Sequence, residues 1–424
     1  MQNKPYLNHD AMQSVLINRN CLTSVSLKYG IKFELFTLRG LWSRAMKTIG
    51  YVIPCFPTLS ETFTGVEMRA MAALGHQVIP FSFVKGQHYQ QADIPLMKQC
   101  SYSSNMPYYS LRHIPYAFRC LPFISQQHEF GRLALIRQGL QLALWADHHH
   151  CQHLHAHFAW HSAAIAIVAA KTLNIPVSFV GHGADIYAGP QDLMAKLAHC
   201  QFCCAVTKAM HAHLQPLTNT PVHYLPCGIE EQNYPELTMQ WQPTQRFLFI
   251  GRLVEKKGVI TLLKALLLLK HPINIDIVGD GPLKAQLSWF CEQHKLTHVV
   301  SFLGSQDAHW LRSHAERYQG LIAPFTIAAN GDTDTGPLVL KEALALGLPI
   351  ITTNLDGCRE ILNPDIGIMV DRDSPEQLAH AITRHQQQTH QALLRQRELG
   401  YRHVMQFFTA NIQAKRLSQW IEAL

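Results

Sequence analysis

Several features of common protein classes are missing from this 424-residue sequence. Charged residues make up only 15% of it and form no dense run of Lys and Arg, which argues against a nucleic-acid-binding protein despite a net charge of +7. The longest uninterrupted apolar run, Ala163–Ala170, is far too short to cross a bilayer. No secretory signal peptide is recognisable, because Arg19 and Asn20 interrupt the apolar stretch near the start.

The 11 cysteines also form no recognisable framework. An odd number of scattered cysteines without a signal peptide indicates reduced thiols and a cytosolic protein. Cys200, Cys203 and Cys204 have no second pair at zinc spacing, so we predict no zinc site there. Apolar residues, by contrast, make up 47% of the sequence, which is enough for a large core and excludes disorder along the whole chain.

Residues 1–45 differ from the rest of the sequence. They show no sustained hydrophobic period, whereas Met46 is followed at once by a segment typical of a buried strand. We expect the folded part to begin near Met46 and residues 1–45 to be a poorly ordered extension. An ordered extension is the alternative.

Beyond this extension, short apolar segments alternate with amphipathic ones in two sets, separated by a polar stretch around residues 230–235. Continuous runs of Val, Ile and Leu between helices are typical of parallel sheets that are covered on both faces. The two sets therefore predict two doubly wound α/β domains, over residues 46–228 and 245–400, with a linker over 229–244 and a last helical segment over 401–424. The expected strands are 48–53, 78–83, 153–158, 177–180, 202–206 and 222–225, and then 247–251, 273–278, 299–303, 321–323, 349–352 and 367–370.

In such domains ligands bind beyond the carboxyl ends of the strands, so the loops that follow strands are the candidate sites. The clearest is the segment Gly251–Gly258 (GRLVEKKG), which opens a helix. Helix starts attract anions, Arg252 offers a planar fork for phosphate oxygens and Lys257 a point charge. A solvated basic turn is the alternative interpretation.

Two further loops of the second half carry polar groups. The segment Ile277–Leu283 (IVGDGPL) has Gly279 and Gly281 after a strand, which is a weak signal by itself. The segment 330–343 is acidic and enters a helix through Pro337, with Asp334 and Glu342 eight residues apart. Carboxylates accept hydrogen bonds from sugar hydroxyls. Alternatively, Asp334 is a helix cap and Glu342 a surface residue.

Two loops of the first half complete the candidates. Residues 57–63 (PTLSETF) follow the first strand, and Thr58 with Glu61, or Ser60 alone, would also fit a helix cap. Residues 180–187 (VGHGADIY) place His182 beside glycines after another strand. A lone histidine in this setting is more often structural than catalytic, but the expected cleft favours a functional role.

Together these loops resemble glycosyltransferase family 4, the retaining enzymes that use nucleotide sugars and have the GT-B fold of two facing Rossmann-like domains. The resemblance covers residues 47–424, where GRLVEKKG, VGDGP, the acidic loop running into EALALGLPI, and HGADIY occur in the family's order. The opening FPTLSETF is similar to a subgroup that builds bacterial exopolysaccharides of the colanic-acid type.

The resemblance implies a role for each candidate residue. Arg252 and Lys257 would hold the donor diphosphate, Glu342 would bond the ribose, and Asp334 would contact the donor sugar. His182 would lie beside the transferred sugar, and Asp185 would orient the acceptor. The remaining donor-binding positions would be Ser60, Glu61 and Thr62 at the diphosphate, Ser305 and Gln306 at the base, and Gly251, Gly279, Gly336, Pro337 and Leu338.

The sequence departs from the family pattern at two neighbouring positions. Asp334 stands where the family has the first Glu of its E-x7-E pair. The usual E-G-x-P reads here as Asp334-Thr335-Gly336-Pro337, so the glycine is shifted by one residue. Both departures lie in the loop that would contact the sugar. Asp332 and Asp334 also spell a D-T-D motif, which we interpret as coincidental and not as a metal site.

Three histidines alternate along the strand expected at 153–158. Their spacing of two would place His153, His155 and His157 on one face, as a metal site requires. The resembling family carries a similar strand without using it for a metal, so we interpret the histidines as structural.

By this resemblance we expect a hexosyltransferase (EC 2.4) that uses a UDP- or GDP-sugar, retains the anomeric configuration and needs no metal or other cofactor. Its acceptor would be lipid-linked or a polysaccharide. The protein would be cytoplasmic, with peripheral attachment to the inner face of the cell membrane left open by its mild positive charge. The last helix would return to the first domain; a core helix of the second domain is the alternative. Alternatives are a GT-B-like nucleotide-sugar epimerase and a degenerate nucleotide-sugar-binding protein without transfer activity.

Overall fold

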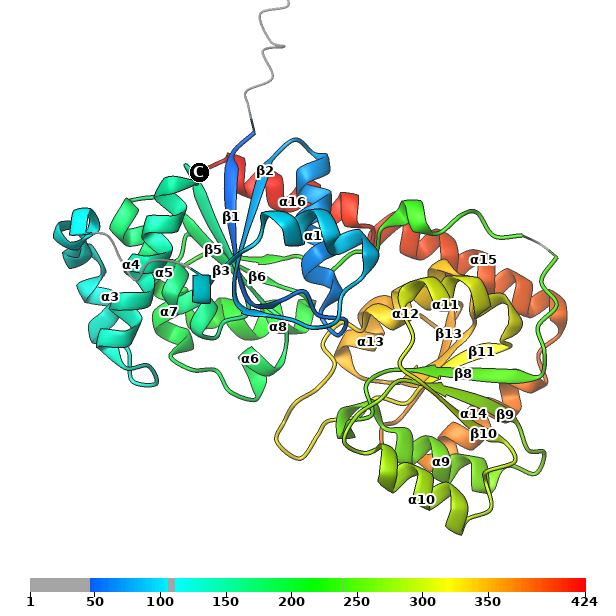
Figure 1. The fold of residues 1–424 in the computed structure, drawn as a ribbon. Coiled ribbons are helices and arrows are strands. Elements are labelled where there is room, and N and C mark those ends of the chain that lie inside the picture. Colours follow the sequence, from blue (N-terminus) through cyan, green and yellow to red (C-terminus); the bar gives the residue numbers. More distant parts are fainter. Residues whose placement is uncertain (1–45, 106–110, 239) are drawn as a thin grey trace, which may run out of the picture. The chain divides into compact units, whose positions relative to one another are not determined.

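The computed structural model describes residues 46–105, 111–238 and 240–424, and two parallel sheets dominate this part of the chain (Figure 1). The extension expected over residues 1–45 lies outside the described residues. Within them, no helix combines the length and the apolar character needed to cross a membrane.

The first sheet has seven strands in the order β3-β2-β1-β4-β5-β6-β7, and all neighbouring strands run parallel. The chain starts in the middle of the sheet, builds toward one edge, and then crosses β1 to build toward the other. The strands are β1 (Thr48–Phe56), β2 (Gln77–Lys85), β3 (Ser101–Tyr102), β4 (His153–His157), β5 (Val177–Gly181), β6 (Phe202–Ala205) and β7 (Val222–Tyr224).

Helices cover both faces of this sheet. The longest apolar run of the sequence lies in α5 and is completely buried between the sheet and α4. Gly139 of α4 permits this close packing, because a Cβ there would lie 2.2 Å from the side chain of Val168. The helices are α1 (Thr62–Ala73), α2 (Ile94–Gln99), α3 (Leu121–Ser125), α4 (Arg132–His148), α5 (His161–Leu173), α6 (Ala184–Tyr187), α7 (Leu193–His199) and α8 (Lys208–Leu214).

The second sheet repeats this plan with six parallel strands in the order β10-β9-β8-β11-β12-β13. Its strands are β8 (Arg246–Ile250), β9 (Asn274–Val278), β10 (Val300–Gly304), β11 (Gly320–Ala323), β12 (Ile350–Thr353) and β13 (Gly367–Val370). The helices around it are α9 (Val259–Leu268), α10 (Lys284–Gln293), α11 (Ala308–His314), α12 (Leu338–Ala345), α13 (Asp356–Ile361), α14 (Pro375–Gln386) and α15 (His390–Phe407).

The predicted fold class of two Rossmann-like doubly wound sheets is therefore confirmed. The strand order reverses between β1 and β4 in the first sheet and between β8 and β11 in the second. Loops beyond such a reversal separate and leave a crevice, which is where ligands bind in doubly wound folds. Every residue of β5 is buried, including Ser178, which interrupts its apolar run.

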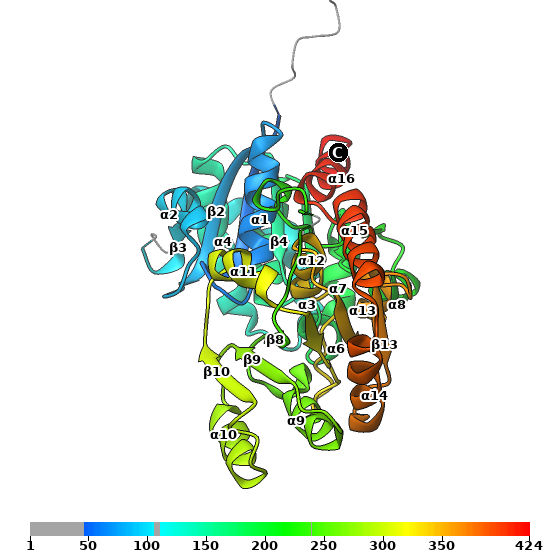
Figure 2. The ribbon, with the colours of Figure 1, turned by 90° about the vertical axis from the view of Figure 1, so that its right-hand side faces the viewer.

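The last helix, α16 (Ala410–Glu422), packs against α1 of the first sheet, and Leu417 and Ile421 lie in the core of that domain (Figure 2). The chain reaches it from α15, beside the second sheet. A parallel bridge between Ile229 and Thr409 joins the two stretches that cross between the sheets. The sequence analysis missed the two-residue strand β3 and the short helices between residues 91 and 125, which are too short to show a hydrophobic period.

Candidate functional site

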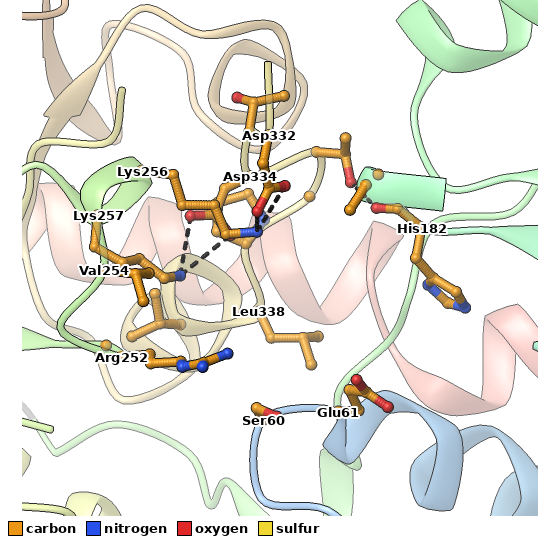
Figure 3. A pocket seen from close by; sticks show the side chains of 18 of the residues that line it. Ser60, Glu61, His182, Arg252, Val254, Lys256, Lys257, Asp332, Asp334 and Leu338 are labelled. Atoms are coloured by element: carbon orange, nitrogen blue, oxygen red, sulfur yellow. Dashed lines mark hydrogen bonds and ion pairs between the residues drawn. The ribbon is translucent and has the colours of Figure 1, made fainter. Parts of the chain in front are cut away.

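A cavity of about 820 Å³ lies beyond the carboxyl ends of both sheets (Figure 3). Loops that follow β1, β4 and β5 line it from the first sheet, and loops that follow β8 and β11 line it from the second. Its volume is in the range that encloses a nucleotide-sized ligand. The predicted site residues that line it are Ser60, Glu61, Thr62, His182, Gly251, Arg252, Lys257, Asp334, Gly336, Pro337, Leu338 and Glu342.

The loop after β8 carries Arg252 into this cavity. Its guanidinium is exposed and has neither an ion pair nor a hydrogen bond with any residue that the structure describes, and Figure 3 shows it extending into the cavity. A guanidinium has five donors in a rigid fork and stays charged at any physiological pH. Arg252 is thus a cation available to an anionic ligand.

Glycines of the neighbouring turn hold this loop in place. A Cβ on Gly279 would lie 1.9 Å from the carbonyl oxygen of Gly251, and a Cβ on Gly281 would lie 2.5 Å from that of Leu253. The main-chain N–H of Leu253 also donates to the carbonyl of Asp280 at 2.9 Å. Gly279 does not line the cavity. Its close contact with Gly251 supports the loop after β8, which does line the cavity.

Both lysines of the β8 loop form ion pairs with the acidic loop before α12. The ammonium of Lys257 lies 3.0 Å from the carboxylate of Asp334, and that of Lys256 lies 3.0 Å from Asp332. The Lys257 and Asp334 side chains are each only 15% exposed. The residue expected at the diphosphate and the residue expected at the sugar are thus bonded to each other, a contact that the sequence analysis did not predict.

Helix α12 starts at the cavity. Pro337 precedes its first residue, Leu338, and both line the wall. Glu342 follows on the next turn, half-buried, and burial raises the pKa of its carboxyl although the charge of Arg312 opposes this. Asp334 does not cap the helix, because no side chain bonds to its first N–H groups. The unpaired N–H groups there add partial positive charge to the cavity wall.

The loop after β1 forms the opposite wall with Ser60, Glu61 and Thr62. Glu61 precedes α1, but no side chain caps this helix, so the capping alternative for these residues does not describe the structure. Burial raises the pKa of the Glu61 carboxyl, while His157 and the hydroxyl of Thr58 act in the opposite direction.

His182 lies at the end of β5 and lines the cavity. Its ring stacks on Phe63, with ring centres 4.2 Å apart, and its Nε2 lies 3.1 Å from Nδ1 of His157. Burial, and then the proximity of His157, lower the pKa of His182 well below its usual range, so its imidazole is neutral at physiological pH. Its main-chain carbonyl accepts a hydrogen bond from the hydroxyl of Thr335.

Asp185 does not line the cavity. Its side chain is fully buried, and its carboxylate accepts hydrogen bonds from the main-chain N–H groups of Ala159, His182 and Gly183, at 2.7, 3.0 and 2.7 Å. The structure thus places this carboxylate against the backbone and not where it would meet an acceptor. It fixes the turn that carries His182.

Ser305 and Gln306 also lie outside the cavity wall. They follow β10 at the edge of the second sheet, and both are exposed. The amide of Gln306 donates to the carbonyl of Leu303 at 3.1 Å. The structure does not bring them together with the other predicted residues.

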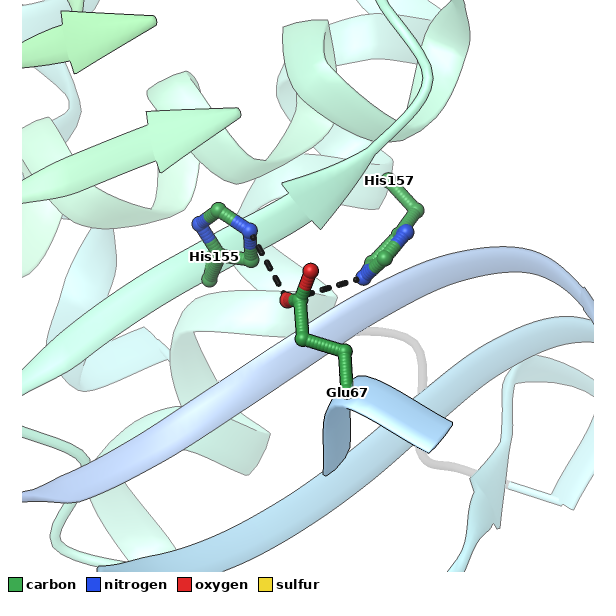
Figure 4. A group of neighbouring side chains, drawn as sticks. All are labelled: Glu67, His155 and His157. Atoms are coloured by element: carbon green, nitrogen blue, oxygen red, sulfur yellow. Dashed lines mark ion pairs between the residues drawn. The ribbon is translucent and has the colours of Figure 1, made fainter. Parts of the chain in front are cut away.

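A second polar group lies behind the cavity, where Glu67 of α1 meets two histidines of β4 (Figure 4). Its Oε1 lies 3.3 Å from Nε2 of His155 and 3.3 Å from Nε2 of His157, and all three side chains are at most 1% exposed. Their ligating atoms lie within 4.8 Å of one another, which makes them the group of described residues that could hold a metal ion. The alternation of the histidines was visible in the sequence, but nothing in it links them to Glu67.

Comparison with known proteins adds to this geometry. Residues 241–397 match the family model "Glycosyl transferases group 1". The chain is 26% identical over 279 residues to a putative teichuronic acid biosynthesis glycosyltransferase of Bacillus subtilis, covering 62% of this chain and 67% of that protein. It is 29% identical over 137 residues to a putative colanic acid biosynthesis glycosyltransferase of Escherichia coli, covering 31% and 34%.

Among solved structures, Anabaena HepE in complex with UDP and glucose superposes with a TM-score of 0.69 at 13% identity, covering 89% of this chain and all of that one. A glycosyltransferase of Rickettsia africae gives the same TM-score at 16% identity, covering 89% and 98%. The aligned parts span between about a third and two thirds of the two bacterial relatives. The chain has the GT-B fold, and its residues 241–397 match the model of the glycosyl transferases group 1 family, in agreement with the resemblance carried by the sequence motifs.

Proposed function

We propose that this protein transfers a hexose from a UDP- or GDP-sugar to a lipid-linked or polysaccharide acceptor, with retention of anomeric configuration. The observation that carries the proposal is the position of Arg252, an exposed guanidinium in a cavity whose opposite wall holds His182. The printed names of the bacterial relatives, which concern teichuronic and colanic acid, support an acceptor of the cell-surface polysaccharide class.

Transfer breaks the bond between the anomeric carbon and the diphosphate, so negative charge builds up on the leaving group. Fixed cations and helix N-termini stabilise that charge where it develops. Arg252, Lys257 and the first turn of α12 all lie in the cavity wall and supply such groups. The positive charges of these groups are enough to balance the negative charge of the diphosphate. We therefore expect no metal ion or other cofactor.

The Lys257–Asp334 ion pair fits this chemistry as an exchange of partners. A diphosphate that approaches Lys257 competes with Asp334 for the ammonium, because both are anions and the lysine has three donors on one nitrogen. Once released, the Asp334 carboxylate can accept hydrogen bonds from sugar hydroxyls. Glu342, half-buried on α12 and without a hydrogen-bonded side-chain partner among the described residues, is the acceptor proposed for the ribose.

A second candidate function follows from the same ion pair. If Asp334 never leaves Lys257, the protein binds a nucleotide sugar without transferring it. Thr335 favours this candidate as well, because its hydroxyl ties the loop to the carbonyl of His182 and restricts movement at the sugar position.

Turnover separates the two functions. UDP-sugars and GDP-sugars are first screened by thermal denaturation, since a ligand that binds only the folded protein raises its melting temperature. The stabilising donor is then incubated with the protein and bacterial membrane lipids, and release of nucleoside diphosphate is measured. The proposed transferase releases nucleoside diphosphate and labels the lipid fraction. Stabilisation without release would favour the binding protein, and neither effect with any donor would contradict both.

The cytoplasmic location and the peripheral attachment to the membrane belong to the same proposal. A lipid-linked acceptor would bring the protein to the inner face of the membrane, where its net charge of +7 suits anionic lipids. Co-sedimentation with vesicles that contain anionic lipids, compared with neutral vesicles, tests this part separately from transfer.

A further inference from the structure

Three buried side chains of the first domain point toward one another behind the cavity (Figure 4). They are Glu67 of α1 and His155 and His157 of β4, and each is at most 1% exposed. Oε1 of Glu67 lies 3.3 Å from Nε2 of each histidine, and the three atoms lie within 4.8 Å of one another. Although they are this close, none of the three atoms has a hydrogen-bond partner among the described residues.

The other polar atom of each of these side chains is already in contact with a partner. Nδ1 of His155 lies 2.7 Å from the hydroxyl of Ser178. Nδ1 of His157 lies 3.1 Å from Nε2 of His182. The second oxygen of the carboxylate accepts a hydrogen bond from the side-chain amide of Gln413 at 2.7 Å. Such outer partners are typical of side chains that bind a metal ion, because they fix the orientation of each ligand.

The distances between the three inward-facing atoms distinguish between possible occupants. Ligand atoms that lie about 2.0–2.1 Å from a tetrahedral ion lie about 3.3–3.4 Å from one another. Two atoms that bond to one water molecule at about 2.8 Å lie about 4.6 Å apart at the same angle. The 3.3 Å from Glu67 to each histidine therefore fits a shared ion and is too short for a shared water molecule.

We propose that Glu67, His155 and His157 bind a divalent transition-metal ion such as zinc. Two imidazoles and a carboxylate are ligands that zinc accepts, and zinc imposes no geometry of its own. The candidate for a fourth ligand is Tyr51, whose hydroxyl is also buried without a hydrogen-bond partner in the part of the chain that the structure describes. Its ring packs against both histidines, with ring centres 5.4 and 5.9 Å apart. From the sequence the histidines were expected to be structural without a metal, since nothing in it links them to Glu67.

The ion would be structural and would take no part in transfer. None of its three ligands lines the cavity, so it is separate from the cations proposed for the diphosphate. It would hold α1 against β4, and both elements lead to the cavity wall. Thr62 and Phe63 at the start of α1 line that wall, and His157 contacts His182, which lines it too. The site depends on neither donor nor acceptor, and a protein that turned over no donor could still hold the ion.

Elemental analysis of the full chain measures the ion directly. The protein is expressed without a histidine tag in medium that contains zinc, and is then dialysed against a chelator. Dialysis removes metal that is bound weakly at the surface, whereas an ion among side chains at most 1% exposed exchanges slowly. We expect about one equivalent of zinc in the wild type, and less than about a tenth of an equivalent of any transition metal would overturn the proposal.

His153 provides a matched control for the ligands. It lies on the same strand, is fully buried and contacts Ser178 at 2.7 Å as His155 does, but it is not part of the converging group. His153→Gln should keep the zinc of the wild type. Glu67→Gln and His157→Gln should each hold at least about tenfold less, because a neutral amide is a poorer ligand than a carboxylate or an imidazole. Equal zinc contents in His153→Gln and Glu67→Gln would overturn the proposal.

The position of the ion is measured on the wild type, so this result does not depend on whether a variant folds. Anomalous X-ray diffraction from crystals of the full chain is recorded on both sides of the zinc absorption edge. The peak should lie about 2.0–2.2 Å from Oε1 of Glu67 and from Nε2 of both histidines. A peak found only at surface histidines, such as the exposed His148 and His150, would overturn the proposal and would show adventitious metal.

Discussion

The ammonium of Lys257 and the carboxylate of Asp334 lie 3.0 Å apart and neutralise each other in the wall of the cavity. The motif resemblance assigns these side chains to different parts of a donor, the diphosphate and the sugar. Under the proposed function, this contact would couple the two binding events as one exchange of partners.

Replacing Arg252 by alanine should lower kcat by about 100-fold or more, which is the usual effect of removing one donor that stabilises developing negative charge. Steady-state release of nucleoside diphosphate is the measurement. Arg359→Ala is the control, because Arg359 is exposed on α13, pairs with Asp356 and does not line the cavity. Similar rates for Arg252→Ala and the wild type would remove Arg252 from the diphosphate site.

Replacing Asp334 by asparagine should strengthen binding of UDP or GDP several-fold while it lowers transfer. The variant frees Lys257 for the diphosphate and removes a nearby negative charge, but it also removes the acceptor proposed for the sugar. Titration calorimetry with the nucleotide and a turnover assay give the two quantities. Asp332→Asn, which breaks the parallel ion pair with Lys256, controls for the general change in charge.

Weaker nucleotide binding by Asp334→Asn than by the wild type would contradict the exchange of partners. It would mean that Asp334 holds Lys257 in the orientation that the diphosphate needs.

The hydroxyl of Thr335 should matter for the position of His182, since it donates to the main-chain carbonyl of that residue. Thr335→Val keeps the shape and removes the hydrogen bond, and we expect kcat/KM for the donor to fall about three- to tenfold, as for one neutral hydrogen bond. Thr333→Val, in the same loop and also in the wall, is the matched control. Unchanged kinetics in Thr335→Val would show that the bond does not position His182.

Lys341 gives a prediction about stability and pH. It is 1% exposed, its ammonium donates to the carbonyl of Cys227 at 2.6 Å, and burial lowers its pKa to about 8. Between pH 8 and the ordinary lysine value the unfolded chain binds more protons than the folded one, so this residue's contribution to stability rises with pH there.

The melting temperature of wild-type protein should therefore rise relative to that of Lys341→Met as the pH increases from 7.5 to 9.5, a window set by the lowered pKa. Comparing the two proteins cancels the titration of other groups. Lys264→Met, at an exposed position on α9, should show no such trend. A difference between wild type and Lys341→Met that stays constant with pH would contradict the lowered pKa.

The sequence was enough to predict every strand of the two sheets except β3, and most loops of the cavity, because most of these strands are rich in apolar residues and the loops follow them directly. It was less informative wherever a contact joins distant segments. Asp185 looked like a cleft residue beside His182, but a carboxylate two residues after a glycine also satisfies main-chain N–H groups, and here it does so at three of them.

The sequence was also uninformative about the position of Ser305 and Gln306. Both follow a strand, as the other predicted site residues do, but they lie outside the cavity wall. Their strand, β10, is at the edge of the sheet and away from the reversal of strand order, and an edge position is not visible in a linear pattern. Glu67 was missed for the opposite reason. It sits within a helix, where a charged residue is ordinary, and only the packing of α1 on β4 reveals that it is buried.

The claim on which the account depends is that Arg252 holds the diphosphate of a nucleotide donor. The most direct measurement is titration calorimetry of wild type and Arg252→Ala with UDP and GDP and with the matching nucleosides, which lack phosphate. The account predicts that Arg252→Ala weakens binding of the nucleoside diphosphate about tenfold or more and leaves binding of the nucleoside unchanged. Equal affinities of both proteins for the nucleoside diphosphate would contradict it.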